Sequence, residues 1–312
     1  MQRTYLRQVI PLISALVWIL GAEALGAQEL GRRFQKIRDG IYVYGVDDAA
    51  GRDPSSNCGI IITREGVVLI DSGPNPPDSL AILKAVKQLT PLPIRFLINT
   101  ETHNDHTTGN FVFSPPAVVI GSAGAAAGMK NYYDPKRNEK LIAESSEMRE
   151  AFRGFRVVTP QVEFHERMTL NLGGRVLELI ELKKIHSDAD TAIWLPQERV
   201  LFSAALAAVK RFGFLRPFVT LENIKSDIKR LKALQPEIVV PAHGRPTPVE
   251  LLDETDKFYD VLLERVGKQM AQGKSLEEIK KNPDLPEYKS WTGGKPRLDT
   301  NIEAAYRALK KP

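Results

Sequence analysis

Cysteine is almost absent from this chain of 312 residues, which contains only Cys58. No disulfide can therefore form within the chain, and its stability must come from a packed core and any metal that it binds. Cys58 lies in an apolar, strand-like run, where a buried and unreactive thiol is expected rather than a nucleophile. Metal ligation by sulfur is not expected either, because no cysteine lies in the segments that contain the candidate metal ligands described below.

A large excess of charge is also lacking. The chain has 43 lysine and arginine residues against 38 aspartate and glutamate residues, which gives a net charge of +5. Its basic residues are not interleaved with aromatic side chains, so the pattern of a nucleic-acid-binding surface is missing. We expect a small-molecule substrate and no nucleic-acid partner. The length is ample for one large domain with its own core.

The apolar stretch near the N-terminus, residues 9–20, is shorter than the roughly 20 residues that a transmembrane helix needs. It follows a basic start with Arg3 and Arg7 and precedes the small-residue stretch 21–27. This order predicts a cleaved signal peptide over residues 1–27 and a mature protein of residues 28–312. We therefore expect a periplasmic or secreted protein without stable membrane association after cleavage.

Short apolar runs and helical patterns alternate along the mature chain, and this alternation predicts an α/β fold with the layers of a four-layer αββα sandwich rather than a doubly wound sheet. Helical periodicity continues beyond residue 274, where we expect a C-terminal helical extension of a single domain. The predicted strands are residues 41–46, 59–63, 67–71, 118–121, 169–172, 176–182, 192–195, 200–203 and 238–241. The predicted helices are residues 79–88, 122–133, 221–234, 249–270 and 301–309.

The segment 101–106, with the sequence ETHNDH, contains four potential metal ligands in six residues directly after an apolar stretch. On an extended backbone Glu101 and His103 share one face, so both can reach the same metal. A tight turn after His103 would direct Asp105 and His106 toward a second point nearby. The alternative is a polar turn with a helix-capping residue. The density of ligands favours a site for two metals.

Histidine is scarce, with only five in the chain. His186 precedes a predicted strand and His243 follows another. A lone histidine is more often a core or loop residue that hydrogen-bonds a backbone carbonyl. Four of the five histidines fall at predicted strand exits, however, and this placement favours one shared site for His103, His106, His186 and His243. His165 lacks that context, and we expect it on the surface or in a strand.

The order of these residues resembles the metallo-β-lactamase superfamily, whose signature is H-x-H-x-D-H after a strand, then a lone histidine, an aspartate and a final histidine. Nearly the whole mature chain can be aligned with that pattern. The resemblance implies that His103 and His186 bind a first metal ion. Position 101 completes this first set of ligands.

The same resemblance implies that Asp105, His106 and His243 bind a second metal ion. Asp71 ends an early strand, and it would lie behind the ligands and orient them. Asp105 would also act as the catalytic residue, positioning a water molecule and accepting its proton. The expected cofactors are two divalent metal ions, with zinc as the first choice and Fe2+ as the alternative.

Two positions depart from the pattern of the superfamily. Glu101 replaces the first histidine, and Ala205 occupies the position of the aspartate that bridges the two metals. The carboxylate adds negative charge to the first site, which should hold a divalent ion firmly but make a bound water a poorer acid. Two histidines and one carboxylate occur at both catalytic zinc and non-haem Fe(II), so ligand type leaves the metal open. Alanine provides no ligand atom.

These features predict a metal-dependent hydrolase in which a metal-bound hydroxide attacks an amide or ester carbonyl, with a β-lactam as the best single substrate. Cations and aromatic residues in segment 207–220 would suit an anionic, partly apolar substrate, although an ordinary exposed loop has the same composition. One alternative is an Fe(II)-dependent oxidoreductase similar to persulfide dioxygenases of the superfamily. Another is a non-catalytic metal-binding relative. Tyr288 and Trp291 are expected to cap the core rather than cover the site.

Overall fold

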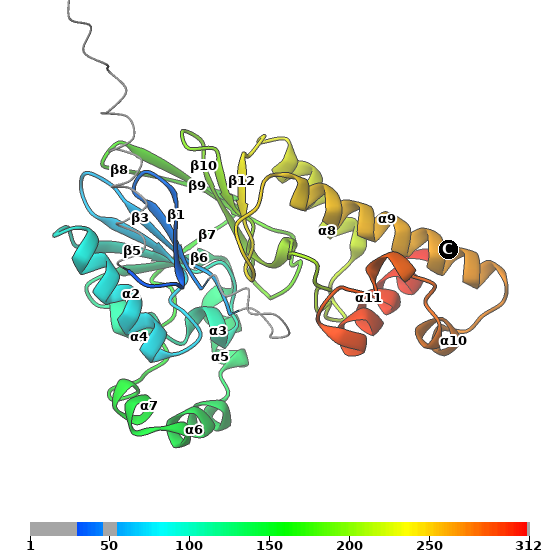
Figure 1. The fold of residues 1–312 in the computed structure, drawn as a ribbon, viewed down its shortest axis with the longest axis horizontal. Coiled ribbons are helices and arrows are strands. Elements are labelled where there is room, and N and C mark those ends of the chain that lie inside the picture. Colours follow the sequence, from blue (N-terminus) through cyan, green and yellow to red (C-terminus); the bar gives the residue numbers. More distant parts are fainter. Residues whose placement is uncertain (1–29, 46–54, 311–312) are drawn as a thin grey trace, which may run out of the picture.

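The computed structural model describes residues 30–45 and 55–310, and it contains two β-sheets with helices on both outer faces (Figure 1). The predicted signal peptide, residues 1–27, lies outside the described residues. In the described part, the first sheet has seven strands in the order β1 to β7, antiparallel from β1 to β4 and parallel from β4 to β7. They are β1 Phe34–Arg38, β2 Ile41–Tyr44, β3 Cys58–Ile62, β4 Val67–Ile70, β5 Ile94–Ile98, β6 Val118–Ser122 and β7 Val162–Phe164.

The second sheet has five strands in the order β12-β11-β10-β9-β8. Its strands pair antiparallel except for β11 and β12, which are parallel, with Phe202 opposite Val240. The strands are β8 Arg167–Leu172, β9 Arg175–Glu181, β10 Thr191–Leu195, β11 Val200–Phe202 and β12 Ile238–Val240.

The central core lies between the two sheets. Branched aliphatic residues from the first sheet, such as Ile61 and Ile98, pack against Leu179 and Ile193 of the second, and all four are fully buried. Gly59 allows this close approach, since a Cβ atom at that position would lie 2.8 Å from the Phe202 ring of the other sheet. Burial of these side chains supplies most of the driving force that joins the sheets.

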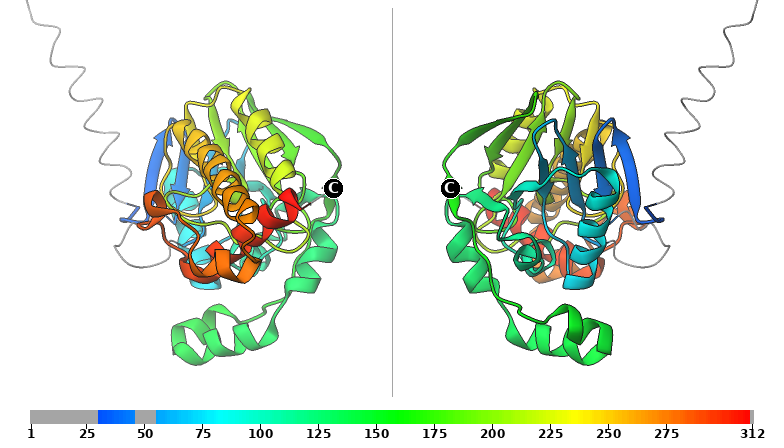
Figure 2. Two further views of the ribbon diagram at one scale, coloured as in Figure 1. Left: turned by 90° about the vertical axis from the view of Figure 1, so that its right-hand side faces the viewer. Right: turned by 90° about the vertical axis from the view of Figure 1, so that its left-hand side faces the viewer.

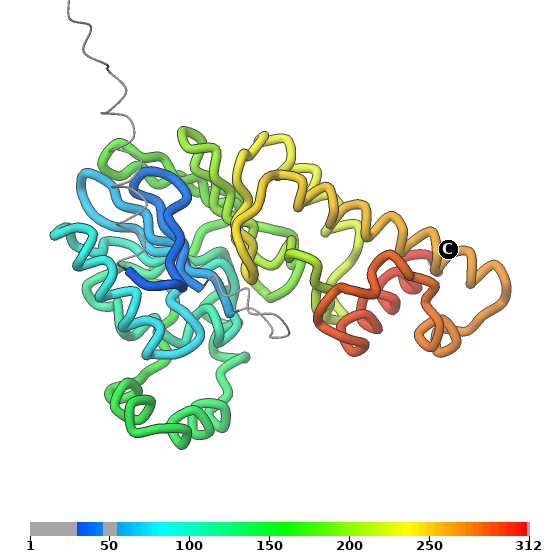
Figure 3. Tube along the Cα trace, viewed as in Figure 1, coloured from blue at the N-terminus to red at the C-terminus, as the bar shows by residue number. Residues whose placement is uncertain are grey.

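Helices cover the outer face of the first sheet. Helix α2 (Pro76–Leu89) begins after Asn75, whose side chain accepts a hydrogen bond from the Asp78 amide, and it buries Ile82 and Val86 against the sheet. The other helices of this half of the chain are α3 Asn104–Thr107, α4 Asn110–Phe113, α5 Ala125–Tyr132, α6 Pro135–Glu144 and α7 Ser146–Ala151. Helices α6 and α7 form a hairpin that projects away from the sheets (Figure 3).

Helices α8 (Leu221–Lys232) and α9 (Glu250–Ala271) cover the outer face of the second sheet, on the side opposite to α2 (Figure 2). The chain then continues through the short helix α10 (Leu276–Lys281) into α11 (Gly294–Leu309), which packs against α9. Two 3-10 helices also occur, η1 Ala204–Leu206 and η2 Pro286–Tyr288. Three separate apolar clusters fill the spaces between the layers, which confirms the predicted αββα sandwich.

Several local features differ from the prediction. Strands β1 and β7 and helices α6 and α7 were not predicted, and α5 begins three residues later because β6 continues to Ser122. Helix α11 begins at Gly294, well before the predicted residue 301. His165 is exposed in the turn between β7 and β8, as predicted. Tyr288 is buried in the core as expected, and Trp291 packs against it. Among the described residues, no helix is both long enough and apolar enough to cross a bilayer.

The strand order brings the predicted ligand segments to one edge of the sandwich. Strands β4 and β5 are parallel neighbours with Ile70 opposite Ile98, so Asp71 and the segment that follows β5 leave the sheet side by side. In the second sheet, β11 and β12 are also parallel and end at this edge, while the connection from β9 to β10 turns here. Carboxyl ends of parallel strands commonly form binding sites, since polar loops can converge there without disturbing the core.

Candidate metal centre

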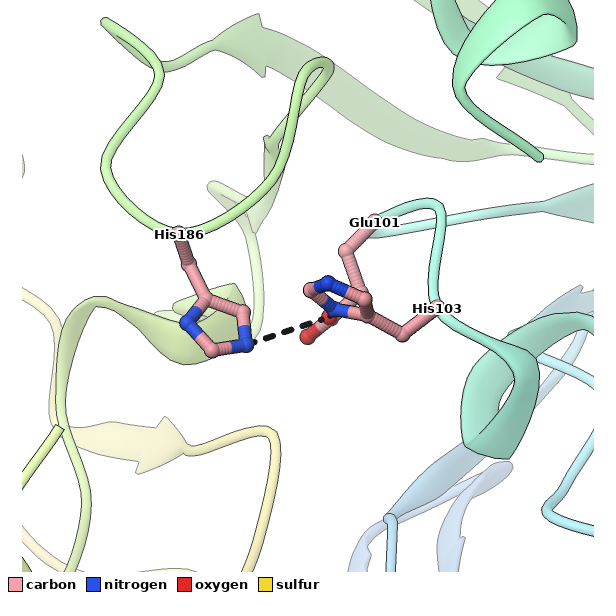
Figure 4. A group of neighbouring side chains, drawn as sticks. All are labelled: Glu101, His103 and His186. Carbon is pink, nitrogen blue, oxygen red and sulfur yellow. Dashed lines mark hydrogen bonds and ion pairs between the residues drawn. The ribbon is translucent and has the colours of Figure 1, made fainter. Parts of the chain in front are cut away.

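The first group of ligand atoms comes from the loop after β5 and from the β9–β10 connection. Glu101, His103 and His186 each place one potential ligand atom within 4.8 Å of the other two. The Glu101 Oε2 atom lies 3.5 Å from His186 Nε2 and is in direct contact with His103 Nδ1 (Figure 4). The structure therefore brings His186 to two residues that lie more than 80 positions earlier in the sequence.

The second group lies next to the first. Asp105 and His106 belong to the short helix α3, and His243 follows β12; their ligand atoms also lie within 4.8 Å of one another. The Asp105 Oδ2 atom is 3.4 Å from His243 Nε2 and 3.6 Å from His106 Nε2. His106 Nε2 also lies 3.3 Å from Oε1 of Glu101, so the two groups are adjacent.

Asp71 occupies the position behind the ligands. Its Oδ2 atom lies 2.8 Å from His106 Nδ1 and accepts a hydrogen bond of 2.6 Å from the Thr100 hydroxyl, while Oδ1 accepts one from the Thr100 amide. The residue is buried and has a left-handed backbone, with a φ angle of 56°. These contacts fix the His106 ring with Nε2 directed to the other ligand atoms, which is the arrangement that carboxylates behind metal-bound histidines provide.

The loop that carries His186 is held by a carboxylate whose role the sequence did not reveal. Asp190 is fully buried and accepts hydrogen bonds from the His186 amide at 2.8 Å and from both the amide and the hydroxyl of Ser187. A guanidinium group of Arg216 donates to the His186 carbonyl oxygen at 3.0 Å. Both sides of the histidine backbone are therefore fixed, which limits the positions open to its ring.

The turn that carries His243 is held in a similar way. The Asn57 side chain donates to the carbonyl oxygens of Pro241 at 2.8 Å and Gly244 at 2.6 Å, and its amide donates to Ala242. Ser56 donates to the Asp105 carbonyl oxygen at 2.5 Å. The segment before β3 thus connects the end of β12 to helix α3, and sequence patterns gave no signal for this connection.

The chemistry of the donor atoms fits divalent cations. Glu101 Oε1, His103 Nε2 and His106 Nε2 are buried and have no hydrogen-bond partner among the described residues. Buried polar atoms without partners are costly, and such atoms are normally paired. Two of them, Glu101 Oε1 and His106 Nε2, lie 3.3 Å apart, and divalent cations bound to the two groups would supply the missing partners. Imidazole and carboxylate donors suit zinc and Fe(II) alike.

The protonation of the site also reflects its crowded charges. Burial acts most strongly on Glu101 and raises its pKa, but His106, His186 and His103 more than offset burial, so the pKa lies well below its usual value. Burial lowers the pKa of His106, yet Glu101, Asp105 and Asp71 raise it to about 10. Burial lowers the pKa of His186 to about 3. Three carboxylates thus surround one imidazole, an excess of negative charge that cations would balance.

Ala205 lies in η1 beside these groups. Its methyl side chain offers no ligand atom, so neither group receives a carboxylate from position 205. The following loop, residues 207–220, forms a wall of the centre. The Arg216 guanidinium lies over the Tyr132 ring at 5.0 Å, and that ring meets the His103 ring at 4.6 Å. Phe214 and Phe218 of the same loop are 37% and 41% exposed. This wall combines a cation with exposed apolar surface.

The C-terminal helix α11 supports this wall. Asn301 is fully buried, and its side-chain amide donates to the carbonyl oxygens of Gly213 and Arg297, both at 2.7 Å. The Thr300 hydroxyl accepts a hydrogen bond from the Leu215 amide at 3.1 Å. The region after residue 274 is therefore joined by hydrogen bonds to the loop that lies over the centre. Sequence patterns did not reveal this supporting role.

Replacing Asn301 with alanine is expected to lower the free energy of unfolding by about 1–3 kcal/mol, because the Gly213 carbonyl loses a buried donor. Chemical unfolding followed by circular dichroism measures this change. The exposed Asn282 provides a matched control, and Asn282→Ala is expected to stay within about 0.5 kcal/mol of the unmodified protein. Equal stability of the two variants would contradict the role of Asn301.

A family model described as the metallo-beta-lactamase superfamily matches residues 51–243, which contain both groups of ligand atoms. A curated relative, the linear primary-alkylsulfatase of Pseudomonas sp. (strain ATCC 19151), is 22% identical over 273 residues. That match includes 73% of this chain but 51% of the relative, so the chain spans about half the length of this protein.

Solved structures are similar as well. A metallo-beta-lactamase from Pontibacter korlensis is 25% identical with a TM-score of 0.56, over 72% of this chain and 96% of that one. The sec-alkylsulfatase Pisa1 from Pseudomonas sp. is 20% identical with a TM-score of 0.66, over 89% of this chain and 50% of that one. The similarity to Pisa1 concerns the fold alone, and it covers more of this chain than the similarity to the protein from Pontibacter korlensis.

Proposed function

Since this chain belongs to the metallo-beta-lactamase superfamily, a family mostly of hydrolases, we propose that it is a metal-dependent hydrolase that cleaves an ester or amide bond in a small anionic molecule. The observation that carries the proposal is the pair of adjacent ligand groups, Glu101, His103 and His186 beside Asp105, His106 and His243. Their buried donor atoms without hydrogen-bond partners support metal binding.

In this proposal Glu101, His103 and His186 hold one divalent ion, and Asp105, His106 and His243 hold the other. When bound, such ions supply Lewis acidity and lower the pKa of water. The Asp105 side chain is 38% exposed, the highest value among the three residues of its group. It can therefore contact solvent, orient a water molecule and accept its proton. Asp71 keeps the His106 ring in the orientation that leaves Nε2 to the metal.

The wall formed by loop 207–220 supports an anionic substrate with an apolar part. The Arg216 guanidinium would attract a negative group, and the exposed rings of Phe214 and Phe218 would contact apolar surface. A β-lactam, which carries a carboxylate, meets both requirements and is the first substrate that we propose. An alkyl sulfate meets them too, and the likeness to alkylsulfatases over most of this chain favours it as the second.

We propose zinc as the metal at both groups. Fe(II) is the alternative at the group Glu101, His103 and His186. Two histidines and one carboxylate also form the ligand set of Fe(II) oxygenases. Glu101, His103 and His186 have this composition, and it favours an oxidoreductase of persulfides as the alternative function. We further propose that the protein acts in the periplasm or outside the cell, on the basis of the basic and apolar N-terminal sequence.

The test is metal analysis of protein purified without added metal, followed by assays with nitrocefin, dodecyl sulfate and a neutral aryl ester. The proposal expects about two metal ions per chain and hydrolysis of at least one anionic substrate in preference to the neutral ester. Oxygen uptake should be recorded in parallel with thiol and persulfide substrates. One iron per chain with oxygen uptake and no hydrolysis would overturn the hydrolase in favour of the oxidoreductase.

A further inference from the structure

Helix α5 packs against both segments that carry the first ligand group. Gly128 faces Thr102 of the ligand-rich segment, and a Cβ atom at this glycine would lie 2.8 Å from the threonine methyl carbon. Ala125 and Met129 of the same helix pack against Ala189 of the β9–β10 connection. Small side chains therefore allow α5 to approach both segments closely, and its C-terminal end lies next to the ligands.

Tyr132, the last residue of α5, contacts a proposed metal ligand and a cation with the same ring. The ring meets the His103 ring edge-on, with 4.6 Å between the centroids, and the Arg216 guanidinium carbon lies over it at 5.0 Å from its centroid. The backbone is fixed as well, because the Asn104 side-chain amide donates to the Tyr132 carbonyl oxygen at 2.9 Å. A single ring therefore separates the guanidinium group from the first ligand group.

Arg216 is held in place, and its charge remains available to a ligand. Besides the Tyr132 ring, its guanidinium lies 5.4 Å from the centroid of the Phe214 ring and donates to the His186 carbonyl oxygen at 3.0 Å. Within residues 30–45 and 55–310 it forms no ion pair with a carboxylate. A guanidinium group has several N–H donors beyond the one that this carbonyl uses. Its positive charge favours a ligand with negative oxygen atoms.

The ring of Tyr132, rather than a phenolate charge, holds the guanidinium. Burial has the largest effect on the pKa of Tyr132 and raises it, while the charge and a hydrogen bond of Arg216 oppose this rise. The net result is a raised pKa, so the hydroxyl stays protonated at neutral pH. The face of a neutral aromatic ring attracts a guanidinium group, and phenylalanine has such a face too.

We propose that Tyr132 is a positioning residue for substrate selection, and that its ring holds the Arg216 guanidinium at a fixed place beside the first ligand group. This inference rests on the proposed hydrolase function and adds how the site selects its substrate class. The negative group of the substrate, a carboxylate or a sulfate, binds the guanidinium while the bond to be cleaved lies at the metal ions. A ligand without a negative group gains nothing from Arg216 and binds more weakly.

The test is calorimetric titration of the metal-loaded protein with benzyl sulfate, phenylacetate and neutral benzyl alcohol. Tyr132→Leu is expected to weaken binding of the preferred anion by about tenfold, because the guanidinium loses the ring that holds it. Binding of benzyl alcohol should change by less than about twofold, since this probe does not use the charge. Tyr132→Phe keeps the ring and should bind the anion within about threefold of the unmodified protein. Arg216→Gln should lower the affinity for the anion to about that for benzyl alcohol.

Tyr133→Leu is the matched control. Tyr133 directly follows Tyr132, is 36% exposed and stacks on the Phe155 ring, with 6.0 Å between the centroids. Loss of its ring should change anion binding by less than about twofold. Metal counts by mass spectrometry should stay at about two per chain in every variant, because none of them removes a ligand.

Either anion preference supports the role of Tyr132. Tighter binding of benzyl sulfate indicates a sulfate ester as the substrate, and tighter binding of phenylacetate indicates a carboxylate such as that of a β-lactam. Equal anion affinities of Tyr132→Leu and Tyr133→Leu, an equal loss for benzyl alcohol, loss of metal from Tyr132→Leu, or no preference for anions in the unmodified protein would overturn it. The expected binding pattern without hydrolysis of any substrate would instead count against the hydrolase, so the two failures can be told apart.

Discussion

Replacing Glu101 with glutamine is expected to weaken metal retention at the first ligand group by about tenfold or more, a loss at the scale seen when support of a metal site is removed. Glu101 is 1% exposed, and its two carboxylate oxygens face His103, His186 and His106. Glutamine keeps the shape of the side chain but removes the negative charge that attracts a cation. A chelator titration, with bound metal counted by mass spectrometry, measures the change.

Two further variants test whether the effect belongs to metal ligation. Glu101→His restores the three histidines of the superfamily, and we expect it to retain metal and to keep or raise hydrolysis. Glu163→Gln is the control, since Glu163 accepts a hydrogen bond from the Ala126 amide but belongs to neither ligand group. It should not change metal retention. If Glu101→Gln retained metal as firmly as the control, Glu101 would be excluded from the coordination sphere.

Replacing His243 with alanine is expected to lower the metal content from about two ions per chain to about one and to reduce hydrolysis by roughly ten- to a hundredfold or more. His243 is the single ligand that the second sheet contributes to the second group, and its Nε2 atom lies 3.4 Å from Asp105. Without it, Asp105 and His106 would remain as two ligands, fewer than a stable zinc site normally has.

His165→Ala is the matched control for this prediction. His165 is exposed in the turn between β7 and β8 and belongs to neither ligand group. Metal counts by mass spectrometry should therefore stay at about two for this variant, and hydrolysis should be unchanged. A metal content of two in both variants would show that His243 is not a ligand.

Local sequence patterns located the strands that build the site. The apolar runs of β3 and β4 are almost entirely buried, and the long periodic pattern of α9 corresponds to a helix with one buried face. The ligand-rich segment after β5 could be recognised because Glu101 to His106 are adjacent in sequence. Such local signals are strong, since the residues concerned need no distant partner to be noticed.

Elements without a strong local pattern were missed. β1 is an edge strand with the sequence FQKIR, which mixes polar and apolar residues without alternation, and β7 has only three residues. Helices α6 and α7 project from the sheets and have few buried side chains, so they lack an apolar stripe. Their positions depend on caps, such as Asp134 before α6 and Ser145 before α7.

Supporting residues were also missed or given no role, because their function depends on contacts over long sequence distances. Asp190 is near His186 in sequence, but only the folded loop directs its carboxylate to the histidine amide. Asn301 lies 88 residues after Gly213, whose carbonyl it contacts. Tyr259 belongs to the amphipathic helix α9. No sequence pattern distinguishes a tyrosine that packs in the core from one that lines a cavity.

The sequence by itself determined the sandwich of layers and two of the three residues in each ligand group, since these follow from periodicity and from adjacency along the chain. The resemblance assigned His186 and His243 to the two groups, but only the tertiary structure shows how distant strand ends bring each histidine to its group. Parallel pairing of β4 with β5 and of β11 with β12 directs their ends to one edge, and the Thr191 amide bonds to the Thr100 carbonyl across the two sheets. Burial of the central core holds the sheets together, and this long-range packing has no signature in any single segment.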